Sequence, residues 1–216
     1  VAGQPVCASC TVALPALKEA CPVCAIPSVN ARMCGKCISH PPCFDCTFAA
    51  WYYHYPIDRL IRSYKFHHRL ELAAWFAKSL AVLLPVPSPL LLAMPLHKNR
   101  LAERGFNQAL EIARYVARFC NGNLSPDSVE KCRETAIQAE LALSERGNNV
   151  RDAFKSLQSF AGQTVVVVDD VMTTGATLNE LARTLKLAGA VKVINLVVAR
   201  TLPIREFPGP GSAMQE

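Results

Sequence analysis

The sequence predicts an α/β protein with a parallel sheet flanked by helices and a small cysteine-rich module at the N-terminus. Thr164–Val168 holds four consecutive valines, the pattern of a central strand buried on both faces. A helical pattern at Ala176–Ala188, ended by Gly189, and a strand-like run at Val191–Val198 follow it. Strand, helix and strand make a βαβ unit, so a parallel, doubly wound sheet follows. Eight of the ten cysteines lie in Cys7–Cys46, all as C-x-x-C pairs.

The remaining elements follow from local patterns. Ile57, Leu60, Ile61 and Tyr64 recur at helical spacing. In chain order we expect a strand at Ala49–Tyr55, helices at Pro56–Lys65 and Arg69–Leu84, a strand at Leu90–Met94, a helix at Gly105–Phe119, and a strand or turn at Ser125–Lys131. We therefore divide the chain into a cysteine-rich zinc-binding module at 1–47, a sheet domain at 48–201 and a loose tail at 202–216.

Composition limits the class of protein. The 216 residues, 51% of them hydrophobic, suffice for one substantial core and a small appended module. The net charge of +6 suits an anionic ligand such as a polyphosphate, or nucleic acid. Leu80–Leu96 is the most apolar stretch, but four prolines interrupt it, so we reject a membrane span. Val1–Pro15 carries no secretory signal, and because the chain begins with Val we expect a trimmed N-terminus.

The strand at Thr164–Val168 runs into residues suited to a sugar phosphate. Ligands of open α/β sheets sit beyond the carboxyl ends of the strands, where this chain has Asp169 and Asp170. Adjacent carboxylates there require a metal ion, hydroxyls or basic neighbours. The next residues offer threonine hydroxyls, a glycine and the N–H groups of a helix start, which suit a phosphate: Thr173, Thr174, Gly175, Ala176 and Thr177.

A basic segment follows the strand Leu90–Met94. It carries His97, Lys98, Arg100 and Arg104 before a helix, and cations at such a place suit pyrophosphate. A solvated basic turn is the alternative interpretation.

The regular C-x-x-C pairs favour zinc over disulfides or redox thiols. Cys21, Cys24, Cys34 and Cys37 have a compact ribbon spacing and form the tetrad we predict. Three possibilities stay open for Cys7 and Cys10: they have no partner, they pair with Cys21 and Cys24, or they pair with Cys43 and Cys46. Cys120 and Cys132 are most simply buried thiols.

The segment VVVVDDVMTTGAT, Val165–Thr177, resembles the 5-phosphoribosyl-1-pyrophosphate (PRPP) signature of type I phosphoribosyltransferases. The resemblance extends to the ComF family of competence-associated phosphoribosyltransferase-like proteins and spans nearly the whole chain, to about Arg200. It is carried by Met94–His97, Arg100–Ala109, Arg133–Thr135, Gln138, Ser144–Arg146, Asn149–Arg151, Ala153–Phe154 and the Cys34–Cys37 pair.

The resemblance implies PRPP binding with Mg²⁺, and transfer of ribosyl phosphate to a nitrogen nucleophile with release of pyrophosphate. Asp169, Asp170 and Arg133 would be the catalytic residues, with the two carboxylates also supporting the Mg²⁺ through PRPP. The threonine-rich loop would hold the 5-phosphate, and the basic segment with Arg133 the pyrophosphate. Lys65 would reach the phosphates. The simpler interpretation is that Lys65 belongs to a basic turn between two helices. Arg133–Phe154 resembles a hood loop that closes over PRPP.

The same resemblance implies a role in DNA uptake during natural transformation, with single-stranded DNA as a partner in the cytoplasm. In the alternative interpretation the chain is a non-catalytic single-stranded DNA-binding module, and PRPP binding is regulatory or vestigial. Aromatic residues at Trp51–Tyr55 could stack bases, but they are equally expected in the core. A scaffold that binds another competence protein is a third possibility.

Overall fold

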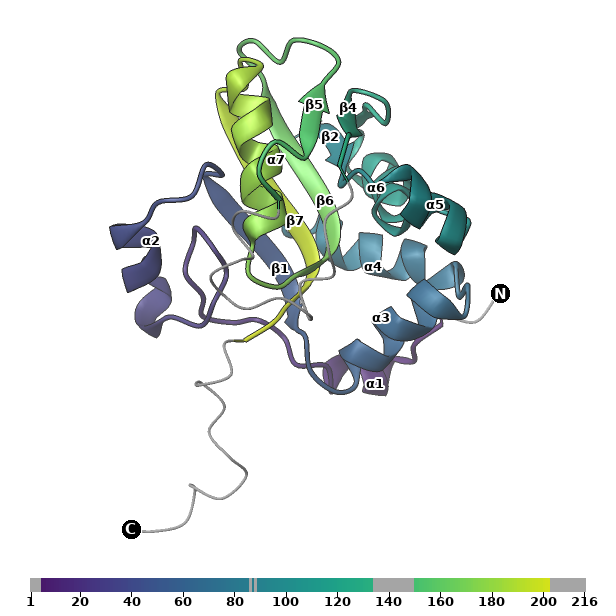
Figure 1. Ribbon diagram of the computed structural model, residues 1–216. Coiled ribbons are helices and arrows are strands. Elements are labelled where there is room, and N and C mark those ends of the chain that lie inside the picture. The colour runs from purple at the N-terminus through teal and green to yellow at the C-terminus, as the bar shows by residue number, and fades with distance from the viewer. Residues whose placement is uncertain (1–4, 86, 88, 134–149, 203–216) are drawn as a thin grey trace.

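The computed structural model describes residues 5–85, 87, 89–133 and 150–202. A five-stranded sheet, all parallel in the order β1-β7-β6-β2-β3, forms its centre (Figure 1). The elements are α1 (Ala8–Val12), the 3-10 turn Val29–Ala31, α2 (Gly35–Ser39), β1 (Cys46–Tyr52), α3 (Ile57–Phe66), α4 (Glu71–Ala81), β2 (Leu90–Ala93), α5 (Lys98–Arg104), α6 (Gln108–Cys120), β3 (Asn123–Leu124), β4 (Val129–Lys131), β5 (Phe154–Ser156), β6 (Thr164–Met172), α7 (Ala176–Leu187) and β7 (Lys192–Arg200). The predicted parallel α/β fold is confirmed.

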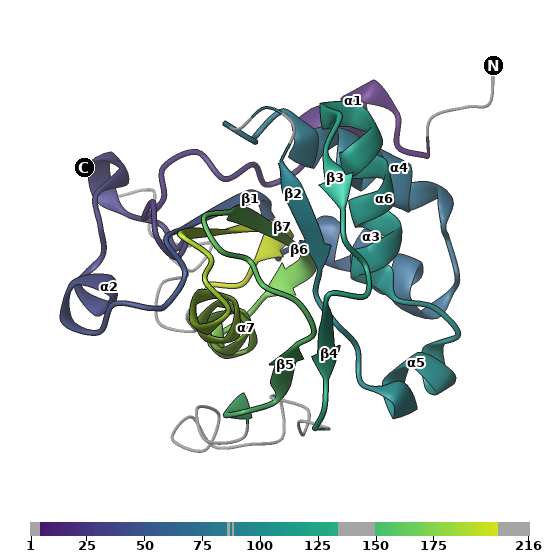
Figure 2. The same cartoon turned by 90° about the horizontal axis from the view of Figure 1, so that it is seen from above.

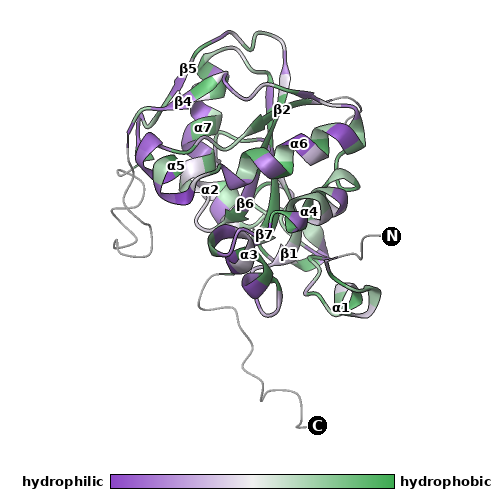
Figure 3. Ribbon diagram, turned by 90° about the vertical axis from the view of Figure 1, so that its right-hand side faces the viewer, coloured by the Kyte–Doolittle hydropathy of each residue, from purple (hydrophilic) through white to green (hydrophobic). Residues whose placement is uncertain are grey.

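The two central strands carry most of the core. Val165–Val168 in β6 are buried and pair with Val193–Leu196 of β7, which is buried along nearly its whole length. Helix α7 lies on one face of the sheet, and α3, α4 and α6 lie on the other (Figure 2). Hydrophobic residues concentrate along the strands, while the outer faces of the helices are mostly polar (Figure 3). Burial on both faces explains why β6 reads as an unbroken apolar run.

The first strand is Cys46–Tyr52 and not Ala49–Tyr55, and two further predicted boundaries, beside the acidic and basic segments, were wrong. β6 does not end at Val168 but continues to Met172, because Asp169–Met172 still pair with β7. The helix predicted at Gly105–Phe119 begins only at Gln108, and Lys98–Arg104 forms a separate helix. Gly105, with a left-handed φ of 75°, ends the first helix, and the Asn107 side chain accepts a hydrogen bond from the Leu110 N–H to begin the second.

The cysteine-rich segment lies against the sheet edge. Leu17 N donates to Ala50 O at 3.2 Å and Tyr52 N donates to Pro15 O at 2.9 Å, so the chain between Cys10 and Cys21 pairs with β1. Trp51 is 6% exposed and stacks on Trp75 with ring centroids 5.0 Å apart, which places this aromatic in the core. β1 itself begins at Cys46, and the division of the chain near residue 47 stays a prediction.

Among the described residues, no helix has the length and apolar character needed to cross a membrane. The predicted tail at 202–216 lies almost wholly outside the described residues.

Candidate functional site

The acidic pair lies at the carboxyl end of β6, in the last four residues of the strand. Asp170 N donates to Asp169 Oδ1 at 2.9 Å, and Lys65 Nζ lies 2.7 Å from Asp170 Oδ2. Burial, followed by the charge of Asp170, raises the pKa of Asp169 to about 7. Lys65 from the end of α3 therefore compensates one carboxylate, while the second is costly to keep ionised without a cation or hydroxyl group.

The loop after the acidic pair has the geometry of a helix start. Gly175 precedes α7 with a left-handed φ of 80°, and its carbonyl accepts from Asn179 N at 2.8 Å. A Cβ at Gly175 would lie 2.6 Å from the Cε of buried Met172, so this position favours glycine. Thr173 is exposed, and Thr174 Oγ1 accepts from Ala176 N at 3.3 Å. The loop Thr173–Thr177 thus joins the acidic pair to the N-terminus of α7.

The basic segment lies after β2, the neighbour of β6. Met94 N donates to Val168 O at 2.9 Å, and Asn107 Nδ2 donates to Met94 O at 3.1 Å, so the end of β2 lies beside Val168, the residue of β6 that precedes the acidic pair. His97 begins α5, its Nδ1 accepting from Asn99 N at 3.4 Å. The basic segment that follows β2 therefore forms a short helix of its own.

The cations of α5 have their own partners. Lys98 Nζ lies 3.8 Å from Glu130 Oε1, and both side chains are largely exposed. Arg104 Nη1 donates to Gln108 Oε1 at 3.0 Å, and its guanidinium lies 5.8 Å from the centre of the Phe66 ring. Arg100 is half-buried on the same helix. The printed partners of Lys98 and Arg104 thus lie on β4, α6 and α3, and not on the acidic pair.

Arg133 is exposed at the border of the described residues, and its Nη1 donates to Arg151 O at 3.0 Å. Most of the predicted hood, residues 134–149, lies outside the described residues. Its two ends are joined by the antiparallel pair β4–β5, with Glu130 opposite Lys155.

Two residues near the site were missed by sequence reasoning. Lys131, in β4, acts to lower the pKa of Asp169, opposing the effect of burial. Arg200, at the end of β7, donates to the carbonyls of Met172 and Thr173, the latter at a short distance. Both come from strands remote in sequence, and a lone basic residue at the end of a strand carries no distinctive signal.

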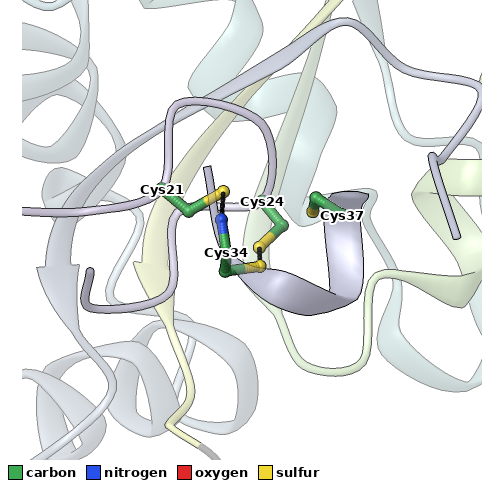
Figure 4. Close-up of side chains that lie close together, drawn as sticks. All are labelled: Cys21, Cys24, Cys34 and Cys37. Atoms are coloured by element: carbon green, nitrogen blue, oxygen red, sulfur yellow. Dashed lines mark hydrogen bonds between the residues drawn. The ribbon is translucent and has the colours of Figure 1, made fainter. Parts of the chain in front are cut away.

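Cys21, Cys24, Cys34 and Cys37 come together in the N-terminal segment (Figure 4). Their four sulfurs lie within 4.8 Å of one another, with Cys24 Sγ and Cys34 Sγ 3.7 Å apart. Sulfurs around a tetrahedral metal with bonds of about 2.3 Å would be roughly 3.8 Å apart, so the spacing fits a thiolate-bound ion. The predicted tetrad is thus a possible metal site, and a four-thiolate donor set suits zinc.

The backbone around the tetrad favours a thiolate at Cys21, whereas burial raises the pKa of Cys24 and of Cys37. Cys34 N donates to Cys21 Sγ at 3.3 Å. Burial acts to raise the pKa of Cys21, but the N–H groups of Cys24, Cys34 and Val23 together outweigh it and lower the pKa to about 7. Because metal ligands must be deprotonated, such N–H donors favour metal binding.

The remaining cysteines stand apart from this tetrad. All ten cysteines are free, and the described residues show one cluster able to hold a metal. Cys7 and Cys10 are exposed, and Cys43 and Cys46 are half-buried. The prediction that Cys120 and Cys132 are buried was wrong in degree, since Cys120 is half-buried and Cys132 exposed.

Comparison with known proteins agrees with this geometry. Residues 111–206 match the phosphoribosyl transferase domain family. DNA utilization protein YhgH of Escherichia coli (strain K12) is 30% identical over 207 residues, covering 91% of this chain and 91% of that protein. Competence protein F of Haemophilus influenzae is 28% identical over 179 residues, covering 76% of each.

Among solved structures, the glutamine PRPP amidotransferase from B. subtilis is 20% identical, with a TM-score of 0.41, and covers 58% of this chain and 25% of that chain. A likeness at that level adds nothing to what the strand order shows. The identity to YhgH over nine-tenths of both chains shows that this chain belongs to the ComF/YhgH family of proteins with a phosphoribosyltransferase domain.

Proposed function

We propose that this protein binds PRPP at the carboxyl edge of its sheet. The observation that carries the proposal is the continuity of β6, the loop and α7. Two carboxylates, Asp169 and Asp170, are followed within a few residues by Gly175 in a left-handed conformation and a helix start. Carboxylates accept hydrogen bonds from ribose hydroxyls, and the N–H groups of Thr173–Thr177 are suited to the 5-phosphate. One segment thereby matches both polar ends of a ribose 5-phosphate.

The pyrophosphate group would lie toward α5. The basic segment with His97, Lys98, Arg100 and Arg104 begins where β2 ends, beside Val168 of β6. Lys65 already contacts Asp170, and Arg133 lies at the start of the predicted hood. Positive charge on both sides of the acidic pair suits a ligand that presents hydroxyl groups at its centre and phosphates at its ends.

The residues present fit Mg²⁺ bound together with PRPP. The fit rests on the Asp169–Asp170 pair, whose oxygens are the donors Mg²⁺ prefers, and on the raised pKa of Asp169, which marks a carboxylate in need of a cation. Mg²⁺ would neutralise the pyrophosphate leaving group. Lys65 holds Asp170 in place, and Asp169 would orient the ribose hydroxyls.

In the proposed reaction the bond from C1 of the ribose to pyrophosphate breaks, and a bond from C1 to a nitrogen nucleophile forms. Pyrophosphate departs with the electron pair of the broken bond, and the nitrogen then loses its proton to water. Asp169, Asp170 and Arg133 are the residues we assign to this transfer, with the carboxylates facing the ribose and the guanidinium facing the leaving group.

We further propose that Cys21, Cys24, Cys34 and Cys37 bind zinc, and that the protein acts on DNA that enters the cell. The zinc assignment rests on the four-sulfur geometry. The DNA role rests on relatives named for DNA utilization and for competence, and on the net charge of +6. In the alternative form of this proposal, the protein binds single-stranded DNA without catalysis and PRPP regulates that binding.

Calorimetric titration with PRPP and Mg²⁺ tests the site. Wild type should bind, the Asp169→Asn/Asp170→Asn variant should not, and Asp127→Asn, an exposed acid before β4, is the matched control. Equal binding by all three would refute the assignment. A pyrophosphate-release screen over nucleobases and amines then separates an enzyme from a binding protein. Single-stranded DNA binding across salt, with and without PRPP, tests the alternative.

A further inference from the structure

Arg200 is a buried cation that links two regions far apart in the chain. It is the last residue of β7 and is 6% exposed. Its Nε donates to Cys24 O at 2.8 Å, across 176 positions of sequence. Its Nη1 donates to Met172 O at 3.1 Å, to Thr201 O at 2.8 Å and to Thr173 O. One guanidinium therefore joins the turn between the first two metal-site cysteines to the loop that follows β6.

The charge of Arg200 has no carboxylate partner among the described residues, where no ion pair involves it. A buried guanidinium with no carboxylate beside it among the described residues is costly. The Cys24 carbonyl that Arg200 contacts belongs to the cysteine tetrad. Four thiolates around a divalent metal carry a net charge of about minus two, so the metal-bound tetrad would supply the missing counter-charge.

A second set of contacts reaches the same loop. Cys43 N donates to Asn179 Oδ1, in the first turn of α7, at 2.7 Å. Buried Phe44 faces Gly175, since a Cβ at that glycine would lie 3.9 Å from Phe44 Cζ. The segment after the tetrad therefore contacts the start of α7, while Arg200 holds the end of β6.

We propose that Arg200 is a positioning residue through which metal binding at Cys21, Cys24, Cys34 and Cys37 fixes the loop Met172–Gly175. With metal bound, the turn at Cys24 is rigid and the charge of Arg200 is balanced, so the carbonyls of Met172 and Thr173 are held. The N–H groups beyond them then keep one orientation. Without metal, the turn at Cys24 is not rigid and the charge of Arg200 is not balanced. The loop Met172–Gly175 then becomes more mobile. The consequence for ligand affinity rests on the proposed PRPP site, whereas the effect on the loop does not.

Hydrogen exchange resolved to single amides tests the loop in the full-length protein. Asn179 N donates to Gly175 O at 2.8 Å and Thr201 N donates to Met172 O at 3.1 Å, so these two amides report on the loop. Chelation of the metal should speed their exchange about tenfold. The amide of Gly122, which donates to Ala117 O at 2.9 Å beyond α6, should not change. No change at Asn179 and Thr201, or an equal increase at Gly122, would overturn the proposal.

Variants separate positioning from general stability. Arg200→Met should retain one zinc per chain but exchange rapidly at Asn179 and Thr201 with or without metal. Arg200→Lys keeps the charge without the planar fork and should give an intermediate response. Arg114→Met, which removes an exposed arginine paired with Glu111, is the matched control and should behave as wild type. A variant at position 200 that still responds fully to metal would contradict the role of Arg200.

Calorimetry with PRPP and Mg²⁺ extends the test to the ligand. Metal-free protein should bind PRPP about tenfold more weakly than zinc-loaded protein. Equal affinities would overturn the link to ligand binding. If the zinc-loaded protein binds no PRPP, the proposed function fails, while the exchange data still decide whether the cluster and the loop are coupled.

Discussion

The loop after β6 is held by buried contacts on both sides, whereas the cations of α5 lie near the surface with partners of their own. Arg200 and Phe44 flank the loop, and both are at most 6% exposed. Lys98, by contrast, has an 85% exposed side chain. In the proposed PRPP complex, the preorganised loop would hold the 5-phosphate, and the long exposed side chains of α5 would hold the pyrophosphate that departs. We therefore expect substitutions around the loop after β6 and substitutions on α5 to have effects of different size.

The largest effect is expected at the acidic pair. Asp169→Asn/Asp170→Asn removes two charged acceptors, each worth about 1.5–3 kcal/mol in hydrogen bonds to a ligand, so PRPP affinity should fall by at least about 100-fold. Calorimetry measures the change, with Asp127→Asn as the control. A loss below about tenfold would place the ribose elsewhere.

A pH effect on the order of 4 kcal/mol on the free energy of unfolding is expected from Asp169 alone. Its folded pKa of about 7 lies above its unfolded value near 3.8, so the native state holds the proton more tightly. The resulting penalty is absent below about pH 4, grows as pH rises and is complete above about pH 7. Asp169→Asn should therefore be more stable than wild type at pH 8 and similar at pH 4. Urea unfolding at both pH values checks this, and a variant less stable at pH 8 would contradict the environment we describe.

Gly175 and Gly105 allow the backbone of the loop after β6 to be compared with the backbone at the end of α5. Gly175 and Gly105 have left-handed φ values of 80° and 75°, but only Gly175 has a neighbour within 4 Å of an added Cβ. Alanine at either position costs about 1 kcal/mol in backbone strain. Gly175→Ala must also displace the end of buried Met172, so its unfolding free energy should fall further than that of Gly105→Ala. Equal losses in urea unfolding would show that the loop adapts freely.

The smallest effects are expected on α5. Lys98→Ala and Arg104→Ala each remove an exposed or half-exposed cation, so PRPP affinity should fall only about two- to fivefold. That loss should shrink as salt is raised, because exposed charges are screened. Affinities measured at low and high ionic strength check this. A loss as large as that at the acidic pair would mean that α5 closes onto the ligand.

Local patterns were sufficient for much of the fold. The valines of β6, the helix at α7 and the C-x-x-C spacing predicted the central strands and the cysteine tetrad, because burial and metal geometry impose short-range rules. The end of β6 was misjudged because Asp169 and Asp170 read as a strand terminus, while pairing with β7 extends the strand past them. The break at Gly105 was missed because apolar periodicity says little about a left-handed cap.

By itself, the sequence determined the class of fold, the acidic pair with its glycine loop, and the cluster of four cysteines, since each depends on residues close together in the chain. Only the tertiary structure decided which cations face that loop. Lys65 reaches Asp170 from α3, and Arg200 joins Cys24 to Met172 from β7. Those contacts depend on strand order and register, which bring together residues far apart in the chain.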